Sequence, residues 1–297
     1  MNLSKPSKEQ LKTTLKAIGL MPLARAIYRR RFAMSHYARQ IAYIKRWAWL
    51  DTEDSNFYYK LTSRNRDQLA HTVAAVSGAP YIEITRYFDE LESDNELRAH
   101  IKRGISSAGY GKDIQVEFGR RLGWYAFIRC LKPQVIIETG VDHGVGACVI
   151  TSALMRNAAE GHAGRYYGTE LRESAGKLLG GEYAHFGQIL YGDSIESLQQ
   201  FDQTIDLFIN DSDHSADYEY REYQTIVGKL SPNGLILGDN SHVTDKLSRF
   251  STEQGRHFLF FAEQPADHWY PGAGIGISFS QTMAQATFRR SPIVSTP

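Results

Sequence analysis

The sequence predicts an α/β fold, in which an N-terminal helical region precedes a doubly wound, mostly parallel seven-stranded sheet with an antiparallel edge strand. From residue 134 onward, short continuous apolar runs alternate with helical segments, as in parallel strands that are buried on both faces. The last two runs, 257–263 and 274–280, are joined by a loop without a helix, which favours antiparallel pairing. No convincing strand pattern occurs between residues 6 and 131.

The pattern of residues 6–131 is helical throughout. In the stretch 63–80, apolar residues recur at helical spacing between a candidate N-cap at Ser63 and a stop at Gly78. Two short helices are expected over 81–105, with a break near Ser93, and a last one ends before Pro133. We therefore divide the chain into residues 1–115, a helical region that serves as a lid, an oligomer contact or a docking surface, and residues 116–297, the domain with the sheet.

The first 50 residues are strongly basic. They carry eleven Lys and Arg against the single acid Glu9, although the net charge of the whole chain is only +1. Aromatic residues such as Tyr28, Phe32 and Trp47 lie among these charges, which would suit peripheral contact with an anionic membrane. The simpler interpretation is a solvated helix face, or a basic arm that docks on the acidic remainder of the chain or on a second subunit, because runs of charge are usually solvated faces. We expect a homo-oligomer and no nucleic-acid partner.

Composition argues against a membrane-spanning or disulfide-stapled protein. The chain has only two cysteines and no apolar run near the roughly 20 residues that cross a bilayer. Its N-terminus lacks the apolar core of a secretory signal. We therefore expect a cytoplasmic protein.

An acidic residue stands at the end of each of five apolar runs. These residues are Glu138, Glu170, Asp193, Asp211 and Asp239. In an open α/β sheet, ligands bind at the carboxyl ends of the strands, near the point where the strand order reverses. The pattern therefore predicts one binding cleft lined by these carboxylates.

The stretch "VIIETGVDHGVG" (residues 135–146) predicts a strand, a tight turn and a helix N-terminus. Gly140, Gly144 and Gly146 allow the backbone to approach a ligand closely. Their spacing, G-x-x-x-G-x-G, differs from the dinucleotide fingerprint G-x-G-x-x-G, which argues against a nicotinamide-dependent oxidoreductase. Glu138 would suit an ammonium group better than a pyrophosphate.

The next two acids fit a nucleoside. Glu170 lies 24 residues beyond Gly146, near the offset at which a carboxylate accepts hydrogen bonds from ribose hydroxyls. Asp193 could accept a hydrogen bond from an adenine amino group. A simpler role for Asp193 or Ser194 is to cap the following helix.

Five motifs in sequence order resemble those of class I methyltransferases that use S-adenosylmethionine (SAM) and have a Rossmann-like sheet. They are "VIIETGVDHGVG", "GTEL", "YGDSIESL", "IDLFINDSDHS" and "LSPNGLILGDN", and the resemblance spans roughly residues 120–280. It implies SAM as the cofactor. The residues implied to bind it are Glu138, Gly140, Gly144, Gly146, Glu170, Asp193, Ser194 and Asp211.

The last two motifs are similar to those of divalent-metal-dependent O-methyltransferases that act on catechols, caffeoyl thioesters and macrolide sugars. This resemblance implies Asp211, Asp239 and Asn240 as ligands of Mg²⁺ or another divalent cation. Carboxylates on adjacent strands, about 4.8 Å apart, could share one hard cation. Asp213 is a rival ligand to Asp211, and a metal-free site stays open because such acids also cap helices.

His214 follows Asp211 by three residues, where the catechol-type families place a lysine base. An imidazole with a pKa of about 6.5 can accept a hydroxyl proton at neutral pH. A histidine that merely hydrogen-bonds Asp211 or Asp239 is the alternative.

The expected function is methyl transfer from SAM to a hydroxyl of a small-molecule, sugar or lipid-linked acceptor, with His214 and Asp211 as catalytic residues. The alternatives are a metal-independent N- or C-methyltransferase, and a non-catalytic SAM-binding or membrane-docking protein.

Overall fold

The computed structural model describes residues 7–213 and 215–283, apart from 51–58 and 109–115. The chain forms two compact units, Met1–Leu50 and Asp51–Pro297. The predicted division lies at residue 115, whereas the compact units meet at residue 50. The two differ because the helices that precede the sheet pack into the same core as the sheet.

The first unit contains helices α1 (Lys8–Ala17), α2 (Met21–His36) and α3 (Ala38–Trp47). A capping box starts α1, because Ser7 and Gln10 each accept a hydrogen bond from the other's backbone amide. Neither α2 nor α3 has a buried residue within its own unit. Among the described residues, every helix is too short or too polar to cross a bilayer.

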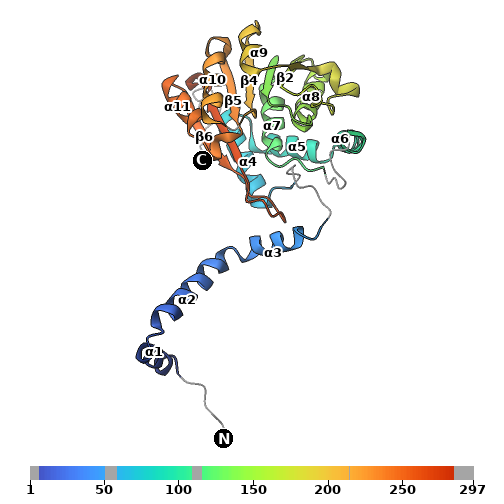
Figure 1. Ribbon diagram of the computed structural model, residues 1–297. Helices are drawn as coiled ribbons and strands as arrows, with labels where there is room; N and C mark the ends of the chain where they lie inside the picture. Colours follow the sequence, from blue (N-terminus) through green and yellow to red (C-terminus); the bar gives the residue numbers. More distant parts are fainter. Residues whose placement is uncertain (1–6, 51–58, 109–115, 214, 284–297) are drawn as a thin grey trace, which may run out of the picture. The chain divides into compact units, whose positions relative to one another are not determined.

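The second unit is built on one seven-stranded sheet with the order β3-β2-β1-β4-β5-β7-β6 (Figure 1). The strands are β1 (Val135–Thr139), β2 (Arg165–Glu170), β3 (Gly187–Tyr191), β4 (Ile205–Asn210), β5 (Leu230–Gly238), β6 (His257–Ala262) and β7 (Gly274–Phe279). Strands β1 to β5 pair in parallel, and β7 runs antiparallel to both β5 and β6. The predicted Rossmann-like sheet is confirmed, with the antiparallel strand inserted one position in from the edge.

Eight α-helices of the second unit are described: α4 (Ser63–Ser77), α5 (Tyr81–Glu92), α6 (Asn95–Ala108), α7 (Arg121–Leu131), α8 (Val145–Ala159), α9 (Ser194–Gln200), α10 (Ala216–Ile226) and α11 (Lys246–Glu253). Short 3₁₀ helices occur at η1 (Gly181–Phe186), η2 (Val227–Lys229) and η3 (Asn240–His242). Thr62, and not Ser63, caps α4, because its side chain accepts a hydrogen bond from the backbone amide of Asn65.

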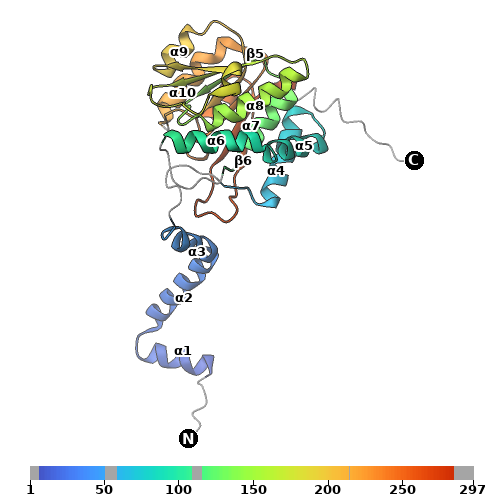
Figure 2. The same cartoon turned by 90° about the vertical axis from the view of Figure 1, so that its right-hand side faces the viewer.

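Alternate residues of the central strands pack into two separate apolar clusters. Ile136 and Leu207 belong to the larger cluster with α4 to α8, whereas Ile137 and Phe208 belong to the smaller one with α9 to α11. Because successive side chains of a strand point to opposite faces, this division places the two helix groups on opposite faces of the sheet (Figures 1 and 2).

Helices α4 to α6 share the larger cluster with the sheet. Leu69 of α4, Phe88 of α5 and Ile101 of α6 are fully buried in it. Arg129 of α7 adds polar links, because it pairs with Glu90 of α5 and with Glu160 after α8. A domain boundary at residue 115 would cut this core, which is why the compact unit begins earlier.

Candidate active site

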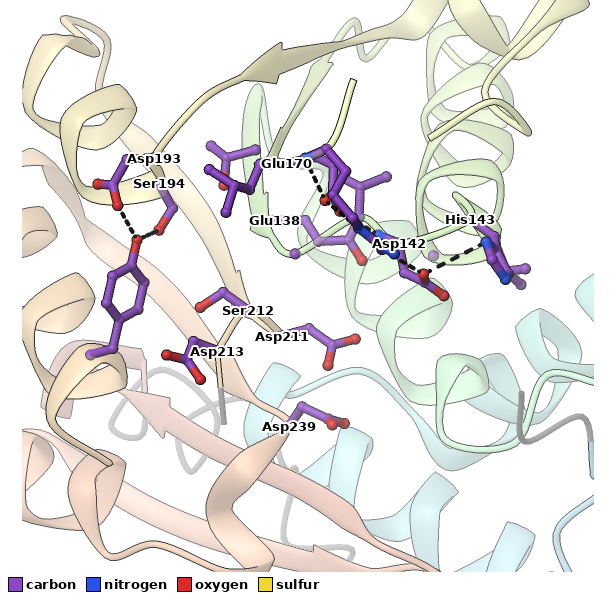
Figure 3. A pocket seen from close by; sticks show the side chains of 18 of the residues that line it. Glu138, Asp142, His143, Glu170, Asp193, Ser194, Asp211, Ser212, Asp213 and Asp239 are labelled. Carbon is purple, nitrogen blue, oxygen red and sulfur yellow. Dashed lines mark hydrogen bonds and ion pairs between the residues drawn. The ribbon is translucent and has the colours of Figure 1, made fainter. Parts of the chain in front are cut away.

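A cavity of about 620 Å³ opens at the carboxyl ends of β1, β2, β4 and β5 (Figure 3). This is the edge at which a doubly wound sheet binds its ligands. Eight predicted site residues line it: Glu138, Gly140, Gly146, Glu170, Asp193, Ser194, Asp211 and Asp239. The structure therefore brings together, in one cleft, the acids that end five separate apolar runs.

The glycine-rich turn after β1 has no room for side chains. Gly140 has a φ of +82°, and a Cβ there would overlap the carbonyl oxygen of Asp211 in the loop after β4. A Cβ on Gly146 would overlap the carboxylate of Glu138. Gly144, with a φ of +101°, is the N-cap of α8 and shapes the turn without lining the cavity.

Glu138 is a buried carboxylate at the floor of the cleft. It is only 2% exposed and accepts a hydrogen bond from the Tyr166 hydroxyl. Burial raises the pKa of Glu138 to about 7, although the Tyr166 hydrogen bond and the charge of Arg121 act in the opposite direction. A cationic ligand beside Glu138 would therefore favour its ionised form.

Glu170, at the end of β2, is held by the turn that follows β1. One carboxylate oxygen accepts from the backbone amide of Asp142 at 2.9 Å, and the other accepts from the backbone amide of Arg172 at 3.0 Å. The contact fixes Asp142 in the left-handed region, with a φ of +47°. The Arg172 Nε donates to the second oxygen as well, at 3.3 Å, so the oxygen that accepts from Asp142 keeps a lone pair for a further hydrogen bond.

Asp193 and Ser194 follow β3 and line the cleft. Asp193 caps α9, since its side chain accepts from the backbone amide of Glu196 at 3.0 Å, and it also accepts from the Tyr218 hydroxyl at 2.8 Å. Burial raises the pKa of Asp193, but these hydrogen bonds outweigh burial and lower it. The capping role that the sequence left open is thus present, and Asp193 lines the cavity as well.

A second buried acid, Glu222 of α10, was missed by the sequence analysis. It accepts hydrogen bonds from four side chains on three segments: Thr139 of β1, Ser194 of α9, and Asn210 and Ser212 at the end of β4. Burial raises its pKa to about 7, against these four hydrogen bonds. Because its partners lie up to 83 residues away, no local pattern could reveal this role.

Asp211 and Asp239 face the same side of the cleft, after β4 and β5 (Figure 3). Burial, followed by the charge of Asp239, raises the pKa of Asp211, and Arg120 opposes this shift. Asp239 forms an ion pair with Arg120, which also lines the cavity and which the sequence analysis missed. In "GRRLGW", Arg120 has the pattern of an ordinary helix start.

Of the three predicted metal ligands, Asp211 and Asp239 line the cavity and Asn240 does not. Asn240 is fully buried outside the cavity lining, and its side-chain amide donates to the carbonyl of Asp213 at 3.4 Å. The Asp213 carboxylate points away from Asp211 and caps a turn at Ser215 (Figure 3). Within the described residues, no group of three or more His, Cys, Asp or Glu is arranged to hold a metal ion. The predicted base His214 lies outside the described residues.

Residues 137–241 match a family model described as "Methyltransferase domain". This segment is a methyltransferase domain. The matched range runs from β1 to η3 and contains all eight of the predicted residues that line the cavity. The resemblance inferred from the five sequence motifs is therefore confirmed at the level of the methyltransferase superfamily.

Solved structures with a similar fold include an O-methyltransferase from Bacillus cereus in complex with SAH, at 13% identity and a TM-score of 0.45. That match covers 62% of this chain and 91% of the other. The O-methyltransferase TomG from Streptomyces achromogenes, in complex with SAM, matches at 14% identity and a TM-score of 0.47, over 63% of this chain and 91% of the other. Because these TM-scores are low, the fold assignment depends on the strand order of this chain. A comparison with curated protein sequences gives no match.

Proposed function

We propose that the protein is an SAM-dependent methyltransferase that transfers the methyl group to a hydroxyl of a small-molecule, sugar or lipid-linked acceptor. The observation that carries this proposal is the single cleft in which the glycine turn and the strand-end acids of the methyltransferase domain meet. A nucleoside sulfonium fits such a cleft, because it carries an ammonium and a sulfonium charge beside ribose hydroxyls.

The residues of the cleft suit each part of the cofactor. Glu138 would pair with the ammonium group, Glu170 would accept from the ribose hydroxyls, and Asp193 with Ser194 would face the adenine. Arg121 also lines the cavity, and its guanidinium forms no ion pair with the described residues. We assign Arg121 to the carboxylate of the methionine moiety, because a guanidinium matches a carboxylate in charge and geometry.

The chemistry requires alignment and a proton acceptor. SAM supplies an electrophilic methyl group and a sulfide leaving group. The acceptor oxygen attacks the methyl carbon, the carbon–sulfur bond breaks toward sulfur, and the hydroxyl proton moves to the carboxylate of Asp211. A raised pKa makes Asp211 a stronger base than an ordinary aspartate, and Asp239 beside it favours the protonated form that results.

SAM binding measured by calorimetry tests the cofactor assignment. We expect binding to the wild-type protein and a loss of about tenfold or more in Glu138→Gln and in Arg121→Met, since each removes a charge opposite the cofactor. Asp202→Asn, which changes an exposed residue outside the cleft, is the matched control. Binding of NADH in place of SAM would contradict the proposal.

The acceptor can be sought with radiolabelled SAM and fractionated cell extracts. Label in an alkali-stable ether would support a hydroxyl acceptor. Label in a methylated amine or carbon would favour the N- or C-methyltransferase alternative, which differs only in the atom that attacks.

A further inference from the structure

Arg120 is a buried cation at the acceptor end of the cleft. Its guanidinium pairs with Asp239 after β5 and donates to Glu263 after β6, at 3.4 Å. Arg120, Asp239 and Glu263 are 9%, 6% and 4% exposed, respectively. Burial alone would lower the pKa of Arg120, but the two carboxylates raise it, so the guanidinium stays charged.

The surrounding residues hold this cation in place. The backbone amide of Arg120 donates to Glu263 at 2.8 Å, and the Tyr59 hydroxyl donates to the same carboxylate at 2.9 Å. Gly119, with a φ of +50°, passes so close that a Cβ would lie 2.9 Å from the Tyr59 ring. Contacts from three separate segments therefore fix the position of the guanidinium before any ligand binds.

A divalent cation and this guanidinium would compete for the same carboxylate. The Arg120 side chain pairs with Asp239, the central member of the predicted metal set. A metal ion bound to Asp239 would lie beside the guanidinium, and the repulsion between them is strong where water is largely excluded. Asn240, the third predicted ligand, directs its amide elsewhere.

We propose that Arg120 takes the place of a divalent cation at this site, so that the guanidinium, together with Asp211 and Asp239, holds the acceptor oxygen and the reaction needs no metal. This inference rests on the proposed function. The fixed positive charge stabilises the negative charge that develops on the oxygen as its proton moves to Asp211. The Arg120 Nε, which has no hydrogen-bond acceptor among the described residues, shows that the guanidinium is not fully satisfied by its carboxylates.

Binding of Mn²⁺ to the full-length protein tests this substitution directly. We expect no specific Mn²⁺ binding to the wild-type protein by electron paramagnetic resonance or calorimetry. Arg120→Ala uncovers Asp211 and Asp239, and should therefore bind Mn²⁺ at least about tenfold more tightly than wild type. The double variant Arg120→Ala/Asp239→Asn should lose this gain.

Two further variants show whether misfolding could cause a change in Mn²⁺ binding. Arg120→Lys keeps a positive charge in the site, so it should fold and gain no Mn²⁺ binding. Arg121→Ala removes the neighbouring guanidinium but leaves the Asp239 pair intact, and it should also gain none. Thermal unfolding reports whether each variant is folded.

Methyl transfer from radiolabelled SAM to the active extract fraction gives the second readout. Label incorporation should be unchanged by dialysis against EDTA, and Arg120→Lys should reduce it about tenfold or more while SAM affinity stays within twofold of wild type. Wild-type Mn²⁺ binding that Asp239→Asn abolishes, or activity that EDTA removes and Mg²⁺ restores, would overturn the inference with the SAM assignment intact. If the wild-type protein binds no SAM, the proposed function fails, and this inference fails with it.

Discussion

At the scale of single residues, the shape of the cleft depends on glycines, because a side chain at their positions would overlap neighbouring atoms. The Glu138 carboxylate lies against the α carbon of Gly146, so the acid and the helix N-terminus share a space that one methyl group would fill. The ligand-binding surface there consists of backbone and one carboxylate, which suits close approach by a small charged group.

Gly146→Ala should therefore weaken SAM binding by about tenfold or more, equivalent to about 1.4 kcal/mol, because the new methyl group displaces Glu138. Calorimetry measures this effect. Gly228→Ala is the control, because a Cβ on Gly228 meets nothing within 4 Å. Equal losses in both variants would show that a general helix or loop effect, and not the cleft, is responsible.

The raised pKa of Glu222 predicts that the stability of the fold depends on pH. This pKa is raised by burial from 4.5 to about 7, so the folded state holds a proton that the unfolded state releases, and the acid costs stability as pH rises from about 4.5 to 7. Glu222→Gln removes this dependence. The stability of the variant relative to wild type should increase between pH 5 and pH 8, by about 3 kcal/mol at most.

Urea unfolding at several pH values measures this difference. Any constant cost of the amide cancels, because only the change with pH is compared. A difference between variant and wild type that is independent of pH would contradict the raised pKa of Glu222.

At the scale of elements, the helices before the sheet are part of its core. Arg129 is 3% exposed and joins α7 to Glu90 of α5 and to Glu160 after α8. Glu90 also accepts from the Tyr125 hydroxyl. This polar cluster connects the helical region to the methyltransferase domain at the helix layer that covers one face of the sheet.

Arg129→Met should lower the free energy of unfolding by about 3 kcal/mol, because it removes a buried guanidinium that donates to Glu90, Asn157 and Glu160. Arg249→Met is the matched control: Arg249 pairs with Glu253 on the surface of α11, where water screens the pair, and its loss should cost far less than the loss of Arg129. Both are measured by urea unfolding. Similar costs for the two variants would contradict the structural role of the buried cluster.

At the scale of the whole molecule, the two compact units differ in chemistry. The first is basic and has no buried residue in α2 or α3, whereas the second holds the sheet and all the described residues that line the cleft. The binding of SAM should therefore depend on the second unit, and contact with an anionic partner should depend on the first.

Removal of residues 1–50 tests this division of roles. The shortened protein should bind SAM within about twofold of the full chain, since all described lining residues lie between 120 and 239. The full chain should sediment with vesicles that contain anionic phospholipid at low salt, and the shortened protein should not. Equal sedimentation of both forms would contradict a membrane role for the basic unit. Neutral vesicles serve as the control.

The sequence by itself determined the parts of this protein that depend on local pattern. Continuous apolar runs marked the strands, and their terminal acids marked the cleft, because the polar end of a buried parallel strand is where a ligand can be reached. The turn glycines were also recognisable, since few other residues tolerate their conformations. The five motifs then led to the methyltransferase superfamily, and the family match confirms that assignment.

Only the tertiary structure decided which charges meet. Arg120 is 119 residues from Asp239 and 143 from Glu263, and no periodicity connects such distant positions. The same holds for Glu222 and its four donors, and for α4 to α6, whose attachment to the sheet depends on shared burial. Electrostatic and packing contacts act through space at a few ångströms. The pairing of Arg120 with Asp239, a predicted metal ligand, is therefore visible only in the folded chain.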